Sequence, residues 1–463
     1  MMNNNIDYNK NGIIIAPAGY GKTEDIATQV KFFNTNKKIL ILTHTNVGIA
    51  ELSSRIKKYN IKSNKVNIMT IASFSLKYIK MFPSISGYDK DKEIFDNGIY
   101  NQMNTLLKNI HIREIIKNSY DQLFVDEYQD CSVLQHEMIK ELCDILDYKI
   151  YGDPLQSIYE FDDIPVNFDE IMGKDYEFIG SLDYPWRWNE KNKKLGQWIL
   201  ETRKQIEFKN SVDLFNIDDT VNFIKTNDIS RSLRKVGFQF ISKNISNVIL
   251  TKLSYQTKNY VKYFAGKYKM QEELECNDLK KITKLIDENK KEEVLIELFN
   301  ILKSSYTGLS KYDNIINKIK THSYDFSKLK NNRELGNLII EYLDNKQVNV
   351  ENIINIINLI ENTDGIKICR YELINVMKKV LSDIKINKSK TALDILRGIT
   401  SNRKQKNFKY IISRVLLVKG LQFENVIVVE PEKMTKKEFY VAISRATNSL
   451  TIISKNDSIK FEN

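Results

Sequence analysis

Cysteine, proline and histidine are scarce in this chain, with four, six and four residues respectively. The cysteines are scattered and form no CxxC pair: Cys131, Cys143, Cys276 and Cys369. Such spacing offers neither a zinc site nor a disulfide framework, and it suits a reducing cytosol. No run of about 18 uncharged apolar residues occurs, which argues against a membrane span. The first residues, MMNNNIDYNKNG, also lack the basic-then-apolar layout of a secretory signal. We therefore expect a cytoplasmic protein with no membrane partner.

The chain is long, moderately apolar and basic. Its 463 residues suggest about two to four domains. Hydrophobic residues make up 42% of it, enough for well-packed cores. The net charge of +11 fits a polyanionic partner such as nucleic acid. The abundance of Lys, Asn and Ile, which AT-rich coding also produces, leaves that interpretation open.

A glycine-bearing turn follows the first apolar run, in NGIIIAPAGYGKTEDIA. Residues 13–15 predict a buried strand, and the spacing of apolar residues after the turn predicts a helix. Strand, glycine turn and helix are the context that a phosphate loop requires. Gly19 and Gly21 let backbone N–H groups converge on phosphate oxygens, and the helix adds its positive dipole end. Lys22 would reach the β- and γ-phosphates, and the Thr23 hydroxyl would ligate Mg²⁺.

The loop as a whole is predicted to bind a nucleotide triphosphate. Its residues are Ala16, Pro17, Ala18, Gly19, Tyr20, Gly21, Lys22 and Thr23. The general pattern begins with glycine, and Ala16 takes that position here. The alternative is an ordinary glycine turn before a helix, but Lys22 and Thr23 in register favour the phosphate loop.

Two carboxylates follow a second apolar run, in DQLFVDEYQDCSVLQHEMIKEL. Residues 123–125 predict a strand, and Asp126 and Glu127 stand at its end, in the crevice where parallel sheets bind ligands. Asp126 is predicted to hold Mg²⁺ through its water shell, and Glu127 to orient and deprotonate the attacking water. The alternative is an acidic helix N-terminus, since a helix follows. The phosphate loop upstream favours catalysis.

The stretch YKIYGDPLQSIYEF repeats this theme, with a strand predicted at residues 149–151. Gln156 follows the strand end, where its amide can sense the γ-phosphate by hydrogen bonding. Taken alone, the same stretch would be an unremarkable turn.

These three stretches, in this order, resemble superfamily 1A helicases of the UvrD/Rep type, for which D-E-Y-Q-D and G-D-P-L-Q-S-I-Y are highly specific. Five further pieces look like motifs of that family: ILTHTNVGIAELSSRI (Ia), IMTIASF (Ib), LDYPWRWN (IV), LLVKGLQFENVIVV (V) and EFYVAISRATNSLTII (VI). The resemblance covers residues 11–200 and 410–455. It implies an α/β fold of two RecA-like P-loop NTPase domains, each interrupted by a mainly helical insertion, which bind ATP and Mg²⁺ between them.

The resemblance also implies roles around the triphosphate. Gln156 would couple the nucleotide state to DNA. Arg187 and Arg445 would be arginine fingers from the second motor domain, which stabilise γ-phosphate charge only when the cleft closes. Trp186 would stack on the adenine. Motif V would contribute Gly420 and Gln422 near the ribose and the domain junction.

A DNA-binding face is implied as well. Phosphate contacts are expected from Thr45, Asn46, Thr70 and Ser73. His44 and Phe161 occupy positions where the family stacks an aromatic ring on a base, a sequence-tolerant contact worth about 1–3 kcal/mol per base. Two alternatives stay open, in which His44 caps a strand end and Phe161 belongs to the core.

The sequence departs from the family pattern at several positions. No glutamine motif that would read the adenine precedes the first strand. Motif IV has Trp186 where tyrosine is more usual, and motif V has Leu416 in place of histidine and Gln422 in place of glutamate. These differences concern adenine specificity and coupling more than the fold.

The motifs divide the chain into four parts. We expect motor domain 1A at residues 1–74 and 120–180, with a short helical 1B insertion at residues 75–119. Motor domain 2A is expected at residues 181–265 and 405–463. The stretch 266–404 is mainly helical in pattern and occupies the position of a 2B insertion.

Two basic stretches have alternative interpretations. Residues 258–269 predict an amphipathic helix with a solvated lysine face, although their interleaved Lys, Tyr and Phe also suit a single-strand binder. Residues 402–410 predict a solvated linker, with Arg403 and Lys404 as candidate phosphate contacts.

Two functional hypotheses follow. The first is an ATP-dependent motor that translocates 3′ to 5′ on single-stranded or tailed DNA. The second is a DNA-responsive ATPase switch or sensor subunit that gates a partner nuclease without processive unwinding. Compact helicase-like proteins occur in bacterial defence and repair operons, and a nuclease partner of the kind in the Gabija system is an analogy only. An RNA helicase is a third interpretation, which the DNA-branch motifs disfavour.

Overall fold

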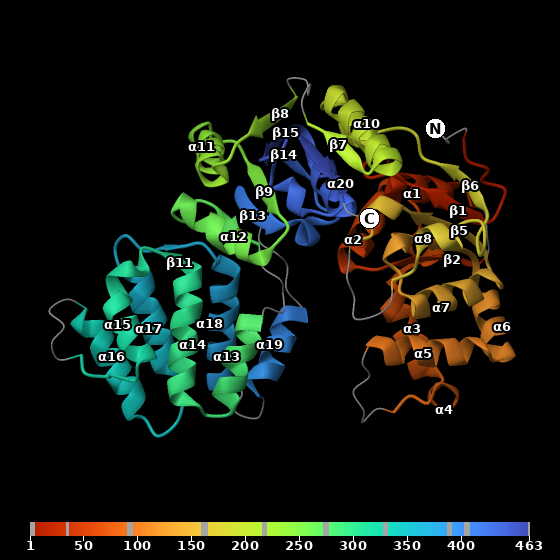
Figure 1. Ribbon diagram of the computed structural model, residues 1–463. Helices are drawn as coiled ribbons and strands as arrows, with labels where there is room; N and C mark the ends of the chain where they lie inside the picture. Colours follow the sequence, from red (N-terminus) through yellow and green to blue (C-terminus); the bar gives the residue numbers. More distant parts are fainter. Residues whose placement is uncertain are drawn as a thin grey trace.

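Two parallel six-stranded sheets and a helical module make up the protein (Figure 1). The computed structural model describes residues 5–33, 37–89, 96–158, 165–214, 220–271, 277–326, 332–386, 391–401 and 408–461. Within these ranges no helix is both long and apolar enough to cross a membrane. In Figure 1 the sheet formed by the N-terminal residues lies at one end, the second sheet lies in the middle and the helical module at the other end.

The first sheet has the strand order β3-β2-β4-β5-β1-β6, and every neighbouring pair is parallel. Its strands are β1 (Gly12–Ile15), β2 (Lys38–Thr43), β3 (Val66–Thr70), β4 (Tyr120–Val125), β5 (Asp147–Gly152) and β6 (Phe178–Ser181). The strands predicted at residues 13–15, 123–125 and 149–151 are thereby confirmed. They are short apolar runs because helices cover both faces of a parallel sheet.

Helices and short 3₁₀ turns connect these strands. They are α1 (Lys22–Phe32), α2 (Asn46–Lys58), α3 (Ile71–Met81), α4 (Pro83–Ser86), α5 (Asp96–Leu107), α6 (Ile110–Ser119), α7 (Val133–Cys143), α8 (Phe168–Ile171), η1 (Ser63–Lys65), η2 (Tyr128–Asp130) and η3 (Pro154–Gln156). The stretch 75–119 is helical where it is described. Its α5 packs against α3 and α7, and Met103 and Leu106 join the apolar core on one face of the sheet.

The strand order brings the candidate site together. β5 lies between β4 and β1. Because the strands are parallel, the segments that follow β1, β4 and β5 all leave the sheet at its carboxyl edge. The predicted phosphate loop, the two carboxylates and the Gln156 turn therefore meet there, as expected for ligand binding in an open α/β sheet.

The second sheet has the order β10-β13-β9-β14-β15-β8 and is also entirely parallel. Its strands are β8 (Val221–Lys225), β9 (Asn247–Thr251), β10 (Lys269–Met270), β13 (Tyr410–Arg414), β14 (Phe423–Val429) and β15 (Ala446–Ser454). Beside it, β7 (Ser211–Asp213) and β16 (Ser458–Lys460) pair antiparallel. The surrounding helices and turns are α9 (Trp186–Asn189), α10 (Lys193–Lys209), α11 (Ile229–Ser242), α12 (Ser254–Tyr260), η4 (Val261–Phe264), η6 (Val415–Val418), η7 (Pro431–Lys433) and α20 (Lys436–Ser444).

With their flanking helices, these sheets are two RecA-like domains in an α/β fold. We call the elements of the first sheet the first domain, and those of the second sheet the second domain. One apolar core cluster runs through both, from Ile14 and Leu155 to Val426 and Phe439. Trp188 is fully buried in this cluster, and its Nε1 donates a hydrogen bond to the Ala446 carbonyl at 2.7 Å. The two domains are thus packed against each other.

The prediction of one amphipathic helix over residues 258–269 is wrong. α12 ends at Tyr260, and η4 ends at Phe264. Ala265 and Gly266 both have left-handed backbone, with φ of 47° and 76°, which a right-handed helix cannot continue. The chain then enters strand β10. Residues 402–407, including Arg403 and Lys404, lie outside the described residues.

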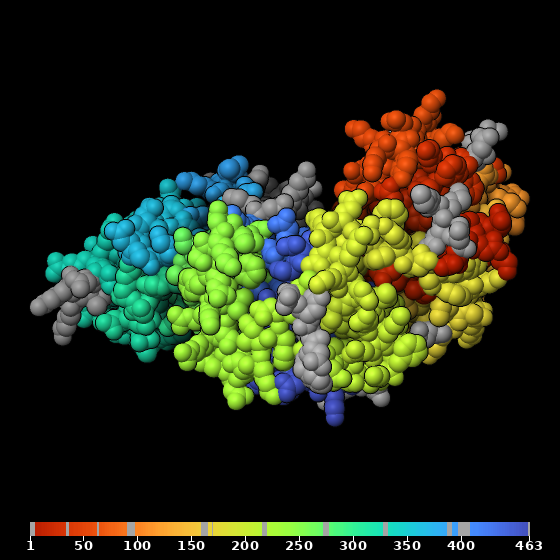
Figure 2. All heavy atoms as spheres, turned by 90° about the horizontal axis from the view of Figure 1, so that it is seen from above, coloured from red at the N-terminus to blue at the C-terminus, as the bar shows by residue number. Residues whose placement is uncertain are grey.

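A helical module (residues 277–401) interrupts the second domain between β10 and β13. It comprises α13 (Asn277–Asp287), α14 (Lys291–Ser305), β11 (Tyr306–Thr307), η5 (Leu309–Tyr312), α15 (Asp313–Lys320), α16 (Arg333–Asp344), α17 (Val350–Asn362), β12 (Lys367–Ile368), α18 (Tyr371–Ile386) and α19 (Ala392–Ser401). The mainly helical pattern predicted for this region is confirmed over its described residues. The module has an apolar core of its own, and it lies on the far side of the second domain from the first (Figures 1 and 2).

Candidate functional site

The predicted phosphate loop (residues 16–23) connects β1 to α1, and the side chains of Trp186 and Trp188 pack against its glycines. Gly19 and Gly21 have left-handed backbone, with φ of 81° and 82°. A Cβ on Gly21 would lie 2.6 Å from Cδ1 of Trp186, and one on Gly19 would lie 2.9 Å from Cζ3 of Trp188. Both positions therefore require glycine for conformation and for space.

Ala16 replaces the first glycine of the general pattern without strain. It is buried and has no positive φ, and its N–H donates to the Gly152 carbonyl at 2.9 Å. This hydrogen bond fixes the start of the loop to the end of β5. Pro17 and Tyr20 close a turn inside the loop, where the Tyr20 N–H donates to the Pro17 carbonyl at 3.1 Å.

Lys22 forms ion pairs with both predicted catalytic carboxylates. Its Nζ lies 2.9 Å from Oδ1 of Asp126 and 2.5 Å from Oε1 of Glu127. Burial lowers the pKa of Lys22, but the two carboxylates outweigh that effect and hold its pKa above the ordinary value. The ammonium group is thus charged and sits where a triphosphate would replace the carboxylates as its partner.

The pKa values of the two carboxylates are shifted in opposite directions from their ordinary values. Burial raises the pKa of Asp126 above its ordinary value although Lys22 opposes it. Burial also acts to raise the pKa of Glu127, but Lys22 and Lys419 outweigh it and hold that pKa below its ordinary value. Glu127 has a left-handed backbone, φ 57°, which is costly for a residue with a side chain and is typical of functional sites. The lower pKa of Glu127 keeps this carboxylate ionised at pH values where Asp126 takes up a proton.

The predicted Mg²⁺ ligands lie beside this cluster. The Thr23 hydroxyl donates to Oε1 of Glu51 at 3.4 Å, and Asp126 pairs with Lys22, the residue before Thr23. Among the described residues no group of three or more His, Cys, Asp or Glu side chains forms a ready metal cage. One hydroxyl and one carboxylate fit Mg²⁺ that takes its other ligands from phosphate oxygens and water.

Arg187 lies over the phosphate loop. Its N–H donates to the Gly19 carbonyl at 3.0 Å, and its Nη1 donates to the Ser444 carbonyl at 2.5 Å. Its buried Nε has no hydrogen-bond partner among the residues that the structure describes. Burial, together with the neighbouring Arg445, lowers the pKa of Arg187 to about 9. An unsatisfied guanidinium beside a second one fits an anionic ligand at this position.

Arg445 contacts Gln156 across the domain interface. Its Nη2 donates to Oε1 of Gln156 at 3.3 Å, and both side chains are buried. Further hydrogen bonds to the Val441 carbonyl and the Ser444 hydroxyl, at 3.0 and 2.8 Å, hold the guanidinium at the end of α20. The structure therefore brings both predicted arginine fingers to the predicted sensor and phosphate loop.

The remaining predicted nucleotide contacts lie at the rim. Trp186 is 55% exposed and meets Tyr184 edge to face, with ring centroids 4.4 Å apart. Its indole thus offers a ring surface beside Gly21. Gly420 and Gln422 are both exposed, and they flank Leu421, whose carbonyl accepts a hydrogen bond from Arg445 at 3.3 Å.

The predicted DNA contacts lie at the carboxyl ends of β2 and β3, which pair in register. Thr45 and Thr70 cap the following helices through hydrogen bonds of 3.0 Å from Gly48 N–H and Ser73 N–H. Thr45, Asn46 and Ser73 are exposed, whereas Thr70 is buried. These side chains follow the ends of two neighbouring strands, and we call them the polar edge of β2 and β3.

The two aromatic candidates have different outcomes. Phe161 lies outside the described residues. His44 is half-buried, with Nε2 at 3.5 Å from the Cys131 sulfur, and burial and Lys419 lower its pKa to about 4. In this conformation the imidazole contacts Cys131 of its own domain.

Several residues of the interface were not predicted from sequence. Lys419 forms a buried ion pair with Asp130, with an Nζ–Oδ1 distance of 2.5 Å. Gln129 donates to Oε2 of Glu127 at 2.5 Å, and Asp153 pairs with Arg203 at 2.8 Å. Lys419, Asp130, Gln129 and Asp153 stand inside the quoted motifs, so these four letters were visible although their contacts were not. Arg203 stands in an ordinary amphipathic helix that carries no motif.

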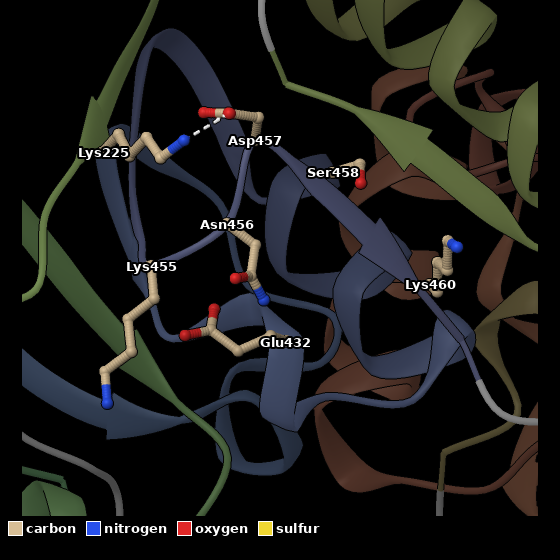
Figure 3. Close-up of a pocket in the computed structure, with 7 residues that line it drawn as sticks. All are labelled: Lys225, Glu432, Lys455, Asn456, Asp457, Ser458 and Lys460. Carbon is tan, nitrogen blue, oxygen red and sulfur yellow. Dashed lines mark hydrogen bonds and ion pairs between the residues drawn. The ribbon is translucent and has the colours of Figure 1, made fainter.

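A separate polar cavity of about 480 Å³ opens beside β8, at one edge of the second sheet (Figure 3). It is lined by Lys225, Glu432, Lys455, Asn456, Asp457, Ser458 and Lys460. None of these residues belongs to the predicted site, and the Lys225 ammonium is paired with Asp457.

Parts of this chain are similar in sequence to known proteins. Residues 3–162 match the family described as AAA domain. RecBCD enzyme subunit RecB of Buchnera aphidicola (Schizaphis graminum) is 29% identical over 185 residues, which is 34% of this chain and 15% of RecB. Gabija protein GajB of Bacillus cereus VD045 is 25% identical over 206 residues, 36% of this chain and 42% of GajB. ATP-dependent DNA helicase Rep of Buchnera aphidicola (Baizongia pistaciae) is 29% identical over 122 residues, 26% of this chain and 18% of Rep. The matched stretch is thus less than half of each relative.

Among solved structures, the crystal structure of the Pif1 helicase from Candida albicans is similar to this chain. The alignment covers 97% of this chain and 92% of the Pif1 chain, with a TM-score of 0.40 and 10% identity. The alignment with Arterivirus nonstructural protein 10, a helicase, covers 97% of this chain and 63% of the viral chain, with a TM-score of 0.38 and 9% identity.

Proposed function

Because this chain belongs to the UvrD/Rep type of superfamily 1 helicases, we propose that it is a DNA motor that hydrolyses ATP between its two RecA-like domains. One observation carries the proposal. Lys22 of the phosphate loop holds Asp126 and Glu127, while from the second domain Arg187 contacts the same loop and Arg445 contacts Gln156. Such a site has a cation for the phosphates, a base for water and two guanidinium groups for the charge that develops.

The ion pairs of Lys22 indicate how binding of a triphosphate leads to its hydrolysis. A triphosphate in the loop takes over the Lys22 ammonium, which releases Glu127 from its ion pair. Glu127 stays ionised because its pKa lies below the ordinary value, so it can orient water and accept its proton. Bound Mg²⁺, next to Thr23 and Asp126, would supply charge neutralisation on the phosphate oxygens.

The arginine side chains connect hydrolysis to domain movement. Arg187 and Arg445 reach the first domain only while the cleft is closed, and Gln156 is held by Arg445 in that state. Loss of the γ-phosphate removes the anion that draws the two guanidinium groups together, which favours opening. Repeated closing and opening would move the polar edge of β2 and β3 relative to the second domain along a DNA strand.

Steady-state ATP hydrolysis with and without single-stranded DNA tests this function. Stimulation by DNA, lost in Glu127→Gln, is the expected result. Glu177→Gln is a matched control, because this exposed glutamate pairs with Lys10 at the surface, away from the site. A low rate that DNA does not change in the wild type would contradict an autonomous motor.

Strand displacement on tailed duplexes tests the proposed polarity. A 3′-to-5′ motor separates duplexes with a 3′ tail and leaves those with a 5′ tail intact. DNA-stimulated hydrolysis without strand separation on either substrate would instead support the switch that gates a partner nuclease. Parallel assays with ATP and GTP measure whether the site selects adenine.

A further inference from the structure

Asp153 connects the predicted base to the predicted sensor. It follows β5 directly and is 1% exposed. Its carboxylate accepts hydrogen bonds from Nε2 of Gln156 at 2.9 Å and from the Leu155 N–H at 3.2 Å. Its own N–H donates to Oε1 of Gln129 at 3.0 Å, and the other end of that amide holds Glu127. A displacement of Asp153 would therefore change the positions of both the Glu127 and the Gln156 side chains.

The charge that balances Asp153 comes from the other side of the interface. Nη1 of Arg203 lies 2.8 and 3.0 Å from the two carboxylate oxygens of Asp153. Arg203 stands on α10, which packs against α20 and β15 of the second domain. Both side chains are buried, and the pKa of Arg203 lies above its ordinary value because Asp153 outweighs the effect of burial. The pair is thus a charged bond between the domains.

Arg203 also reaches the phosphate loop through a tyrosine. The same Nη1 donates to the Tyr440 hydroxyl at 2.9 Å, and the guanidinium lies over that ring, 5.0 Å from its centroid. The Tyr440 hydroxyl in turn accepts the Ala18 N–H at 3.2 Å. Tyr440 is almost fully buried, and burial raises its pKa, so it stays a neutral hydroxyl. One guanidinium thereby connects Asp153 and the phosphate loop.

We infer that Arg203 is a positioning residue that couples closure of the domains to alignment of Glu127, Gln156 and the phosphate loop. The inference rests on the proposed function, because alignment matters only if the site hydrolyses a nucleotide. In the closed cleft Arg203 fixes Asp153, and Asp153 fixes the two glutamines. When the domains part, Asp153 loses its counter-charge and this alignment is released. In this inference Arg203 acts through Asp153 and Tyr440 and not by contact with the reacting atoms.

The first test is Arg203→Lys, which keeps the charge but replaces the planar guanidinium, whose Nη1 serves Asp153 and Tyr440 while its Nε serves Glu207, with a compact ammonium. We expect the DNA-stimulated kcat to fall at least about tenfold while the KM for ATP stays within about threefold, since misplacement alone reduces turnover. Glu207→Gln is the matched control. Glu207 pairs with Nε of the same arginine at 3.0 Å, so its loss spares the Asp153 contact. A kcat of Arg203→Lys equal to that of the control would overturn the inference.

A second variant separates positioning from folding. Arg203→Met alone leaves Asp153 buried without a counter-charge, which can unfold the protein. Arg203→Met combined with Asp153→Asn removes both charges. We expect this double variant to regain thermal stability but not turnover. Recovery of turnover along with stability would mean that Arg203 only neutralises Asp153, and the inference would be wrong.

Hydrogen exchange gives a readout that does not depend on hydrolysis. In Arg203→Lys, peptides covering residues 14–22 and 153–158 should exchange faster than in the wild type, whereas Glu207→Gln should leave them unchanged. If the wild type lacks DNA-stimulated hydrolysis but the exchange difference appears, the proposed function fails and the contact stands. If hydrolysis is DNA-stimulated and neither kcat nor exchange responds to Arg203→Lys, the inference fails and the function stands.

Discussion

Arg445 and Gln156 meet across the domain interface, where Nη2 of the arginine donates to Oε1 of the glutamine at 3.3 Å. The amide of Gln156 is held at its other end by Asp153 at 2.9 Å. Two elements far apart in the sequence, η3 and the end of α20, thus fix one side chain between them. A side chain held from both domains responds to their separation.

This contact predicts that Arg445 and Gln156 work as a unit. Arg445→Ala or Gln156→Ala should each lower kcat by about 10²–10³, the usual cost of removing one donor that stabilises developing charge. The double variant should lose little more than the worse single variant, because residues that act together are not additive. Rapid-quench ATP hydrolysis measures this, with the exposed Arg234→Ala on α11 as control. A double variant whose loss is the product of the single losses would contradict the coupling.

Loss of the Lys22 ammonium should abolish turnover rather than merely weaken it. In Lys22→Met, Asp126 and Glu127 lose the cation that lies 2.9 and 2.5 Å from them. Two carboxylates at one buried site then oppose each other, and the triphosphate meets negative charge in place of an ammonium. We expect kcat/KM for ATP to fall by more than about 10². Titration of ATP by calorimetry should show weakened binding, and unchanged affinity would contradict this assignment of the phosphate loop.

Trp186 should contribute to binding of the base and not to chemistry. Its indole is 55% exposed beside Gly21, so it is free to stack. Trp186→Ala should raise the KM for ATP about three- to tenfold with little change in kcat, since an aromatic pair is worth about 0.5–1.5 kcal/mol. Trp186→Tyr should restore most of the affinity. An unchanged KM in Trp186→Ala, measured against ATP and GTP, would show that the ring does not contact the base.

Much of the site could be predicted because its signals are local. The phosphate loop, the Asp126–Glu127 pair and Gln156 each follow an apolar strand directly, and parallel strands place their carboxyl ends at one edge. The glycines at 19 and 21 likewise mark a turn in which a side chain has no room. Short-range patterns of this kind are sufficient to place all three segments together.

The contacts between the domains could not be predicted in the same way. Arg203 is one of several basic residues on α10, and helical periodicity does not say which of them meets a carboxylate fifty positions earlier. The end of the 258–269 stretch was missed for a related reason. Ala265 adopts a left-handed backbone, which local sequence patterns do not predict for an alanine. Such features depend on tertiary packing, which overrides local propensity.

His44 should make the protein sensitive to acid. Burial, with Lys419 nearby, lowers its pKa from 6.5 to about 4, so the unfolded chain binds the proton more readily than the folded one. The stabilisation is fully present above pH 6.5 and is lost as the pH falls toward 4, with a size on the order of 3 kcal/mol. His44→Asn should flatten the dependence of the urea midpoint on pH over that window. His111→Asn, at an 82% exposed side chain, is the control and should leave the slope unchanged.

The helical module should fold without the motor domains. Its apolar core is built from residues of its own helices. At its base Arg370 is fully buried and lies 2.9 Å from Asp278. Residues 277–401 expressed alone should therefore give a helical circular-dichroism spectrum and a cooperative thermal transition. Arg370→Met should destabilise this fragment by about 1.5–3 kcal/mol, because it removes the charged hydrogen bonds that the buried guanidinium makes to Asp278 and to the Ser304 hydroxyl.

Lys303→Met is the matched control for this experiment, since the Lys303–Asp313 pair lies at the surface with about half of each side chain exposed. Its cost should stay below about 1 kcal/mol, as for other exposed pairs. A fragment without a cooperative transition would mean that the module depends on the second domain, which it meets where Lys269 donates to the Ile368 carbonyl at 2.6 Å. Equal losses in the two variants would instead mean that burial of Arg370 carries no special weight in the module.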